Sequence, residues 1–560
     1  MNTQNAAPMT SAGCCGGPAP SGVAACCVKD ADAKASGETG CGCASAAPSE
    51  GSEATGPAAA CCGTSKAESE ALGPGINPLD RAPWPVTVIG AGPVGLSAVA
   101  HLIERGIEPL LLEAGDSVGA NLRDYGHVRL FSPWRYNIDP AMAAQLETAG
   151  WNAPRLDELP LASEIVERVL QPYAALPAVA RALRLKTRVR AISRDGFDKV
   201  KTAGRERAPF VIRALQGGKP VEFPARAVID ASGTWGTPNP LGANGLPATG
   251  ERENAQAIFY GIPDVLGHQR GRYAGKRTLV VGAGHSAANA LLALADLATT
   301  APGTRLTWAV RSPMLTRVFG GGDADALPAR GQLGSALRAL RDSGRMEFIS
   351  SLRITDIERD GAALTVHGID AEQRPIELAG IDQIVCATGQ RPDLSLTSEL
   401  RLKLDPLLES AEALGPLIDP NLHSCGTVRP HGHRELSHPE PGFYTLGVKS
   451  YGRAPTFLMA TGFEQARSVV AAIAGDLEAA DRVELDLPET GVCGIGVAQS
   501  AGDGGACCAA TADSADSVSA TSARPPASAP KAASGCARAS CATPAAAARP
   551  QIERVARCCT

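Results

Sequence analysis

The sequence predicts an α/β chain organised around two strand–turn–helix–strand units, and three observations support this. A G-x-G-x-x-G pattern at 90–95 directly follows the apolar run 86–89. A related G-x-G-x-x-A pattern at 282–287 follows the apolar run 279–281. After each pattern comes a helical apolar stretch and then a second short strand, at 110–112 and at 306–310. This order is typical of parallel sheets whose glycine-rich turns bind dinucleotides.

The first unit has the residues that an unphosphorylated ADP moiety requires. Gly90 allows the tight turn, Gly92 lets the backbone approach a pyrophosphate, and Gly95 lets the helix pack close to the strand. The following helix directs its free N–H groups toward the phosphates. Glu113 follows the next strand, and a carboxylate there binds ribose hydroxyls and repels a 2′-phosphate. The first unit therefore favours FAD or NAD.

The second unit ends in the opposite charge. Gly282 and Gly284 occupy the glycine positions, and Ser286 opens the alanine-rich helix. The next strand is followed by Arg311, whose guanidinium suits a 2′-phosphate. The simplest interpretation is FAD at the first unit and NADPH at the second. The alternative for Arg311 is a solvated arginine at a strand end.

Length and charge limit the classes of protein. The chain has 560 residues, enough for several domains, and a net charge of −5 without a basic run. Nucleic acid and anionic membranes are therefore poor partners, and we expect a small-molecule substrate or a soft metal or metalloid. No apolar run approaches the roughly 20 residues of a membrane span. The first residues lack the features of a signal peptide, so a cytoplasmic location is expected.

The cysteines are concentrated at the two ends. Of the 17, eight precede residue 65, seven follow residue 490, and only Cys386 and Cys425 lie between. Adjacent pairs occur at 14–15, 26–27, 61–62, 507–508 and 558–559. Such a pair brings two soft thiolates to one soft ion, whereas structural zinc sites use C-x₂-C spacing. The pair Cys558 and Cys559 is the candidate metal-binding pair.

The end segments are also distinct in composition. Residues 1–79 and 477–560 are dominated by Ala, Gly, Ser, Pro and Cys. This composition predicts disordered tails.

The segment at 119–137 is rich in aromatic and basic residues, although only 4% of the chain is aromatic. It follows the first unit, where such folds meet the flavin ring. Asn121, Arg129, Trp134 and Arg135 are therefore candidate contacts of flavin or substrate. The alternative is a surface loop with a half-buried tryptophan.

The remaining chain predicts helices at 140–186 and strands at 187–231, with a hairpin at Gly217–Gly218. Two strands end in small-residue turns, one at 231–233 and one at 386–389, where the backbone can pass next to a cofactor. Thr388 and Gly389 belong to the second turn, and Cys386 is expected to be a small core residue. A helix is expected at 455–474, with proline at its start.

These motifs, together with the C-A-T-G-Q-R-P-D run at 386–393, resemble those of the two-dinucleotide-binding-domain flavoproteins. This superfamily includes flavin-containing monooxygenases and thioredoxin-reductase-like enzymes. The resemblance spans about 84 to 476. It implies a discontinuous FAD-binding domain, at 84–275 and 386–476, with an NADPH-binding domain inserted at 276–385. Gly90, Gly92, Gly95 and Glu113 would bind FAD, and Gly282, Gly284, Ser286 and Arg311 would bind NADPH.

The branch of the superfamily is less clearly marked. Disulfide reductases need two close cysteines beside the flavin, and none are present between 81 and 490, which favours a monooxygenase-like enzyme. The monooxygenase fingerprint is imperfect, because His268 stands seven residues after Gly261 rather than four, followed by Tyr273. His268 is therefore either catalytic or an ordinary loop histidine, and no general acid or base is assigned.

The cysteine-rich tails suggest a substrate class through resemblance. Similar bacterial flavoproteins are associated with arsenic resistance, and mercuric reductase also ends in an adjacent cysteine pair. Two alternatives therefore accompany the NADPH-dependent FAD oxidoreductase. One is a thiol-relay or metal(loid) reductase that uses Cys558 and Cys559, and the other is a soft-metal binding protein on a flavoprotein scaffold.

Overall fold

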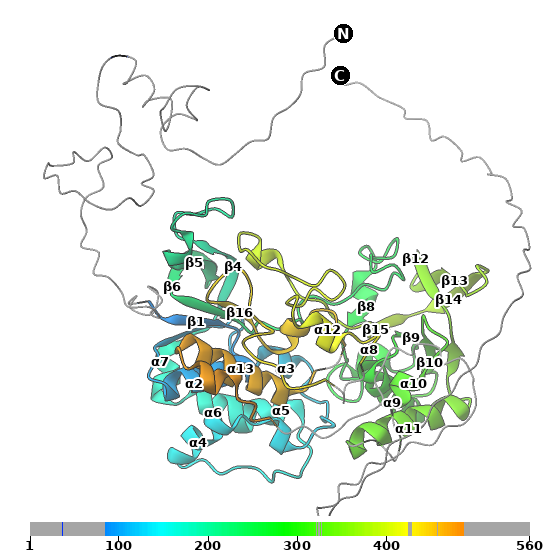
Figure 1. Ribbon diagram of the computed structural model, residues 1–560. Helices are drawn as coiled ribbons and strands as arrows, with labels where there is room; N and C mark the ends of the chain where they lie inside the picture. Colours follow the sequence, from blue (N-terminus) through cyan, green and yellow to red (C-terminus); the bar gives the residue numbers. More distant parts are fainter. Residues whose placement is uncertain are drawn as a thin grey trace, which may run out of the picture. The chain divides into compact units, whose positions relative to one another are not determined.

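A computed structural model describes residues 84–485 apart from 321, 323, 324, 326, 424–427 and 456, together with Ser36 (Figure 1). Most of the expected tails lie outside these residues. One part of the expectation is wrong, because 477–481 form helix α14 (Leu477–Asp481). The Asp476 side chain accepts a hydrogen bond from the Ala479 N–H, and Ala480 is buried. This cap and this contact extend the ordered chain past 476 despite its alanine-rich composition.

The first sheet is parallel and has the order β16-β7-β1-β2-β3. Its strands are β1 (Val86–Ile89), β2 (Pro109–Leu112), β3 (Leu183–Arg184), β7 (Ala227–Asp230) and β16 (Phe443–Thr445). The chain leaves β1 toward β2 on one side, whereas β7 pairs on the other side. The order thus reverses at β1, and ligands of such sheets bind outside the carboxyl ends of the strands at this point.

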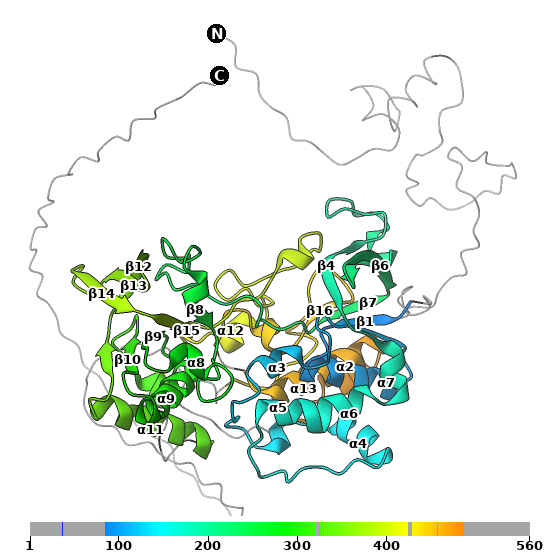
Figure 2. The ribbon, with the colours of Figure 1, turned by 180° about the vertical axis from the view of Figure 1, so that it is seen from behind.

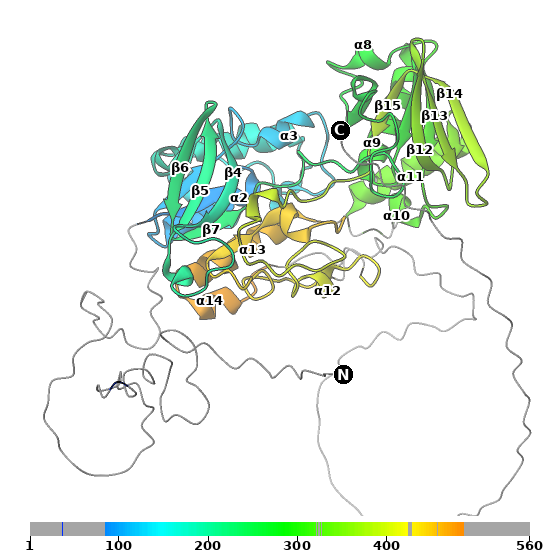
Figure 3. The same cartoon turned by 90° about the horizontal axis from the view of Figure 1, so that it is seen from above.

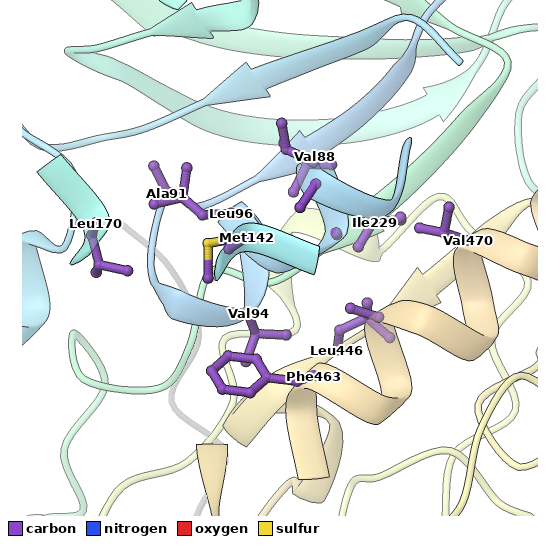
Figure 4. Close-up of a cluster of buried hydrophobic side chains, with 14 of the residues drawn as sticks. Val88, Ala91, Val94, Leu96, Met142, Leu170, Ile229, Leu446, Phe463 and Val470 are labelled. Atoms are coloured by element: carbon purple, nitrogen blue, oxygen red, sulfur yellow. The ribbon is translucent and has the colours of Figure 1, made fainter. Parts of the chain in front are cut away.

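Two layers cover this sheet, with α2 (Pro93–Glu104) and α13 (Met459–Ile473) on one face and an antiparallel sheet on the other (Figures 1 and 2). That antiparallel sheet is formed by β4 (Thr187–Arg194), β5 (Phe210–Gln216) and β6 (Lys219–Ala225), with the expected turn at Gly217–Gly218. Val88 of β1 packs toward the helices, and Ile89 packs toward the antiparallel sheet. This alternation of period two gives the sheet two apolar faces. Figure 4 shows the core on the helical side.

The region expected to be helical, 140–186, consists of short helices and ends in β3. Its helical elements are α4 (Pro140–Thr148), α5 (Ala162–Ile165), the π-helical turn Val166–Leu170, α6 (Gln171–Ala174) and α7 (Pro177–Ala182). Before this region lie α3 (Ala120–Asp124) and the 3-10 helix Trp134–Tyr136. Prolines at the first turns of α4, α6 and α7 mark where helices begin.

The second sheet is also parallel, with the order β11-β10-β9-β15-β8. Its strands are β8 (Ile258–Tyr260), β9 (Arg277–Val281), β10 (Arg305–Ala309), β11 (Glu347–Ile349) and β15 (Gln383–Cys386). One face packs against α9 (His285–Thr300) and α11 (Pro328–Asp342) (Figure 3). The other packs against the antiparallel strands β12 (Arg353–Asp360), β13 (Ala363–Ile369) and β14 (Pro375–Ile381). Short helices complete this part of the chain and the segment after it: α8 (Arg270–Tyr273), α10 (Thr316–Phe319) and α12 (Gly415–Ile418).

The second sheet is inserted between β7 and β16 of the first, as the expected discontinuous domain requires. Its limits differ from the expected boundaries at 276 and 385. The second sheet begins with β8 at Ile258 and includes Cys386. The edge strand β8 precedes the glycine motif, so a boundary drawn at that motif misses it. The helix expected from Pro455 instead begins at Met459.

None of the helices in the described part of the chain is both long enough and apolar enough to cross a membrane.

Candidate functional site

The first glycine-rich turn forms a close-packed cradle at the carboxyl end of β1. Gly90 has φ +98°, and a Cβ added there would lie 2.6 Å from the Ala231 carbonyl oxygen. A Cβ on Gly95 would lie 1.9 Å from the Gly90 carbonyl oxygen. At Gly92, by contrast, a Cβ would meet no protein atom within 4 Å. Gly90 and Gly95 are therefore required by packing, whereas Gly92 faces open space where a phosphate can approach.

The two helices that follow the glycine-rich turns begin in the same way. Helix α2 starts after Gly92 and α9 after Gly284, and neither has a side-chain cap or an acidic residue in its first turn. No side chain therefore binds the free backbone N–H groups at the N-terminus of either helix. Combined with the positive end of the helix dipole, both termini suit an anionic pyrophosphate.

Glu113 lies where an ADP ribose is expected, directly after β2. Its side chain is buried, and its two carboxylate oxygens accept hydrogen bonds from the Ala91 and Gly115 N–H groups, each at 2.7 Å. Ala91 belongs to the glycine-rich turn, so the carboxylate is fixed against that turn. A carboxylate has about four acceptor positions, which leaves room for ribose hydroxyls.

The turn 231–233 lies directly beside the first glycine-rich turn. The Ala231 N–H donates to the Ile89 carbonyl at 2.9 Å. The amide nitrogen of Asn121 would lie 3.6 Å from a Cβ on Gly233. The structure therefore brings Asn121 to this turn, and its contact with the cofactor stays a prediction.

A lysine that the sequence analysis missed also reaches this turn. The Lys449 ammonium donates to the Asp230 carboxylate at 2.7 Å and to the Ser232 hydroxyl at 3.1 Å. The Lys449 side chain is 2% exposed and that of Asp230 is 1% exposed. More than 200 residues separate the two in sequence, so no local pattern indicated this pair. The acid before the small-residue turn was the available signal.

The second glycine-rich turn repeats the geometry of the first. A Cβ on Gly282 would lie 2.2 Å from the Ala387 carbonyl oxygen, and one on Gly284 would meet nothing within 4 Å. The Trp308 indole N–H donates to the Gly282 carbonyl at 2.8 Å, which holds the turn from β10. Ser286 is half-buried at the second position of α9.

Arg311 lies two residues beyond β10, at the carboxyl edge of the second sheet. Its side chain is exposed, and its Nη1 donates to the Ala243 carbonyl at 2.8 Å. Guanidinium has five N–H donors, so this one bond orients the group without using its capacity to bind a phosphate.

The two segments that connect the sheets are hydrogen-bonded to each other. The Asn239 N–H donates to the Gly389 carbonyl at 2.9 Å, and the Thr388 hydroxyl donates to the Asn239 carbonyl at 2.8 Å. The Thr234 hydroxyl donates to the Gln390 side chain at 3.0 Å. Thr388 and Gly389 therefore hold the two connecting segments together through hydrogen bonds to Asn239.

The aromatic-rich segment divides between core and surface. Trp134 is 1% exposed and packs in the hydrophobic core, so it is not the half-buried tryptophan of a surface loop, and its contact with flavin or substrate stays a prediction. Arg129 donates to the Leu159 carbonyl at 2.6 Å, and exposed Arg135 lies 5.3 Å from the Tyr136 ring. Phe131 instead reaches the second unit, where its ring contacts His285. The positions of Trp134 and Phe131 depend on packing between segments that are distant in sequence, so the spacing of residues in this segment does not predict them.

The residues of the imperfect fingerprint do not converge. His268 has a 72% exposed side chain, and its Nδ1 lies 2.8 Å from an oxygen of Asp264. Tyr273 is fully buried in the core under the second sheet. The Tyr260 hydroxyl donates to Glu251 at 2.6 Å. His268 therefore matches the alternative of an ordinary loop histidine.

Cys386 is a buried residue of β15, as expected. Its thiol is 3.5 Å from the Asn239 carbonyl and 3.1 Å from the Thr388 hydroxyl. Burial raises the pKa of this thiol to about 12. Within the described residues, no group of three or more His, Cys, Asp or Glu side chains could hold a metal. The candidate pair Cys558 and Cys559 lies outside the described residues, as does Cys425.

The geometry fits two dinucleotides. Each sheet has a glycine-rich turn that side chains would obstruct, an uncapped helix terminus beyond it, and a polar residue after the next strand. The first of these polar residues is an acid and the second is a base. These residues can hold FAD at the first turn and NADPH at the second.

Comparisons with known proteins agree with this arrangement. The model of the pyridine nucleotide-disulphide oxidoreductase family matches residues 87–421. The bacillithiol disulfide reductase Bdr (YpdA) from Bacillus cereus is 17% identical, with a TM-score of 0.51 over 70% of this chain and 98% of that chain. DfoA, an FAD-bound cadaverine monooxygenase from Erwinia amylovora, is 15% identical, with a TM-score of 0.50 over 70% and 94%. At these identities the likeness shows the fold. The comparison with curated protein sequences gives no match.

Proposed function

This chain belongs to the pyridine nucleotide-disulphide oxidoreductase family, and on that premise we propose that it is a monooxygenase-like enzyme that uses dioxygen as its electron acceptor. It is an NADPH-dependent flavoprotein oxidoreductase whose cofactors are FAD and NADPH. The acceptor of the electrons is the part of the reaction that is proposed.

The residues divide between the two cofactors. Gly90, Gly92 and Gly95 admit the FAD pyrophosphate to the terminus of α2, and Glu113 binds its ribose. Gly282 and Gly284 do the same for NADPH at α9. Arg311 attracts the 2′-phosphate that distinguishes NADPH from NADH.

When bound, FAD supplies the redox chemistry by taking a hydride from NADPH and passing two electrons to dioxygen. In the proposed reaction one oxygen atom enters the substrate. The other leaves as water, so that NADPH, one proton, dioxygen and substrate give NADP⁺, water and oxygenated substrate. The protein binds and orients the two cofactors.

The proposal that dioxygen accepts the electrons rests on the cysteines. A reductase that passes electrons to a disulfide needs a close pair of thiols at the flavin. Cys386 is buried, its pKa is raised, and the next cysteine is 39 positions away in the sequence. The thiolate is the reactive form of cysteine in thiol–disulfide exchange, so Cys386 is poorly suited to relay electrons to a disulfide. This favours dioxygen.

A second candidate function rests on the tail sequences. Five adjacent cysteine pairs occur outside the described residues, and such pairs chelate soft ions. In this alternative, Cys558 and Cys559 relay electrons or a metal(loid) such as trivalent arsenic to the flavin, as part of metalloid resistance.

The test is anaerobic reduction of the purified holoenzyme by NADPH, followed by mixing with oxygen. The monooxygenase proposal predicts a delay before oxidised flavin returns, and one oxygen atom from ¹⁸O₂ in the product. Immediate release of hydrogen peroxide in stoichiometric amounts, with or without candidate substrates, would contradict it.

A chain shortened to residues 80–490 distinguishes the second candidate. Oxygen-dependent turnover should survive the loss of both tails. If reduction of disulfide, arsenic or mercury acceptors disappears in this shortened chain while NADPH still reduces the flavin, the relay function is favoured.

A further inference from the structure

The strand β16 has a buried ion pair at each of its ends. Glu440 precedes the strand and accepts hydrogen bonds from Arg194, at 2.8 Å, and from Arg205. Lys449 follows the strand and pairs with Asp230. Both sites consist of a buried carboxylate with cationic partners. They differ in their position relative to the cofactor, because dinucleotides bind at the carboxyl ends of parallel strands, and only the Lys449 site lies at that end.

The pair at the carboxyl end is part of a small network. Besides accepting from Lys449, Asp230 accepts from the Ser232 hydroxyl at 2.6 Å and from the Ser232 N–H at 3.1 Å. The Ser232 hydroxyl also accepts from Lys449. The ammonium therefore binds two polar groups directly, the Asp230 carboxylate and the Ser232 hydroxyl, and the carboxylate in turn binds the Ser232 N–H.

This turn forms one wall of the FAD cradle. The Ala231 carbonyl lies so close to Gly90 that a Cβ there would be 2.6 Å away, and Gly233 lies beside Asn121. Since Asp230 also pairs with Ile89 across the parallel strands, the ion pair and the glycine-rich turn share one backbone framework. A shift of the 231–233 turn changes the space available to FAD.

Because both groups are charged, the pair is sensitive to the removal of either side chain. Both side chains are almost fully buried, and removing one partner leaves the other charge in a poorly solvated site. The carboxylate would then draw in water or turn toward the surface, and either response moves Ser232.

We propose that Lys449 is a positioning residue of the FAD site, which holds the 231–233 turn against the first glycine-rich turn through Asp230 and Ser232. The proposal rests on the assignment of FAD to this sheet and is independent of the electron acceptor.

The test compares variants at the two ends of β16. Lys449→Met removes the ammonium at the cofactor end, and Arg205→Met removes a buried guanidinium from the Glu440 cluster at the other end. The full-length apoprotein is titrated with FAD by fluorescence, and its unfolding temperature is measured in parallel. We expect both variants to lower the unfolding temperature, but only Lys449→Met to weaken FAD binding, by about tenfold or more.

The charge-neutral double variant Asp230→Asn/Lys449→Met isolates the role of the ammonium. It removes the unpaired charge, so it should regain unfolding temperature relative to Lys449→Met and remain folded. It still lacks the bond from Lys449 to Ser232, so its FAD affinity should lie between those of Lys449→Met and the wild type.

Two results would overturn the proposal. One is equal loss of FAD affinity in Lys449→Met and Arg205→Met, which would show a general effect of stability. The other is wild-type FAD affinity in the double variant, which also decides the question if Lys449→Met does not fold. Because FAD binding is measured without oxygen or substrate, neither result bears on the proposed monooxygenation.

Discussion

The ring of Phe131 lies 5.1 Å from the ring of His285, with 52° between the two planes. Phe131 belongs to the aromatic-rich segment that follows the FAD-binding unit, and His285 is the first residue of α9. An aromatic contact thus joins the segment that follows the first glycine-rich unit to the second glycine-rich turn, the proposed site of NADPH. Hydride transfer requires the two cofactors to meet, so this contact lies where their relative position matters.

Phe131→Ala should slow the anaerobic reduction of the flavin by NADPH about three- to tenfold, because an aromatic pair contributes roughly 1 kcal/mol. FAD affinity should not change. Stopped-flow absorbance of the flavin measures the rate, and Phe131→Tyr, which preserves the ring, is the control. A normal reduction rate in Phe131→Ala would show that the contact has no part in positioning NADPH.

Arg311→Glu should reverse the preference for the phosphorylated coenzyme. The carboxylate repels the 2′-phosphate, so kcat/KM for NADPH should fall on the order of 100-fold while that for NADH is retained or rises. The matched control is Arg305→Glu, since Arg305 is exposed at the amino end of β10, the strand that precedes Arg311. Equal losses with both coenzymes would remove Arg311 from the proposed phosphate site.

Glu113→Gln should weaken FAD binding about tenfold, because an amide supplies one acceptor oxygen where the carboxylate supplies two. Fluorescence titration of the apoprotein measures the change. Glu108→Gln is the control, because Glu108 is exposed before β2 and its carbonyl rather than its side chain bonds Val86. Unchanged affinity in Glu113→Gln would contradict the role assigned to this carboxylate.

His431 should make stability depend on pH. Its Nδ1 lies 3.0 Å from the Arg429 carbonyl, and its Nε2 lies 2.9 Å from the Gln465 amide nitrogen. The Gln465 amide oxygen accepts from the Gly447 N–H at 2.8 Å, so its nitrogen must face His431 and Nε2 must accept. The ring is therefore neutral. Burial lowers its pKa below the ordinary value of 6.5, although Glu435 and Glu464 oppose this.

The sign follows from the lowered pKa in the folded state. The contribution of His431 is complete above about pH 6.5. It is lost as the pH falls toward the folded pKa, by up to about 1.4 kcal/mol per pH unit. Unfolding temperatures between pH 5 and 8 measure this, and His431→Gln should flatten the acid side of the curve. His423→Gln is the control. Identical acid sensitivity in His431→Gln and the wild type would contradict the prediction.

Cys386→Ala should leave the NADPH-driven reduction of flavin within about twofold of the wild type, because the buried thiol fills space in β15 and does not react. The pKa of this thiol, raised to about 12, also predicts slow alkylation of Cys386 in the native protein at pH 8. Loss of NADPH-driven reduction in Cys386→Ala would instead indicate a redox role for Cys386.

Sequence patterns predicted the parts of the fold that depend on local periodicity and backbone geometry. The strand before Gly90 and the helix after it appear where expected, as do the hairpin at Gly217–Gly218 and the second unit around Gly282. Glu113 meets the glycine-rich turn because sheet register places the end of β2 beside that of β1. The sequence did not predict that Trp134 packs in the core, since an aromatic residue in a polar segment is compatible with either surface or core.

By itself, the sequence determined that this chain has two dinucleotide-binding units of opposite charge and no close pair of cysteines between 81 and 490. Those features follow from short-range requirements: only glycine fits the closest turns, and a charge at a strand end selects its ligand. Only the tertiary structure decided that Lys449 pairs with Asp230, that Phe131 meets His285, and that β8 joins the second sheet. Each of these joins distant segments through packing and desolvation, which act between surfaces that come together only when the chain folds.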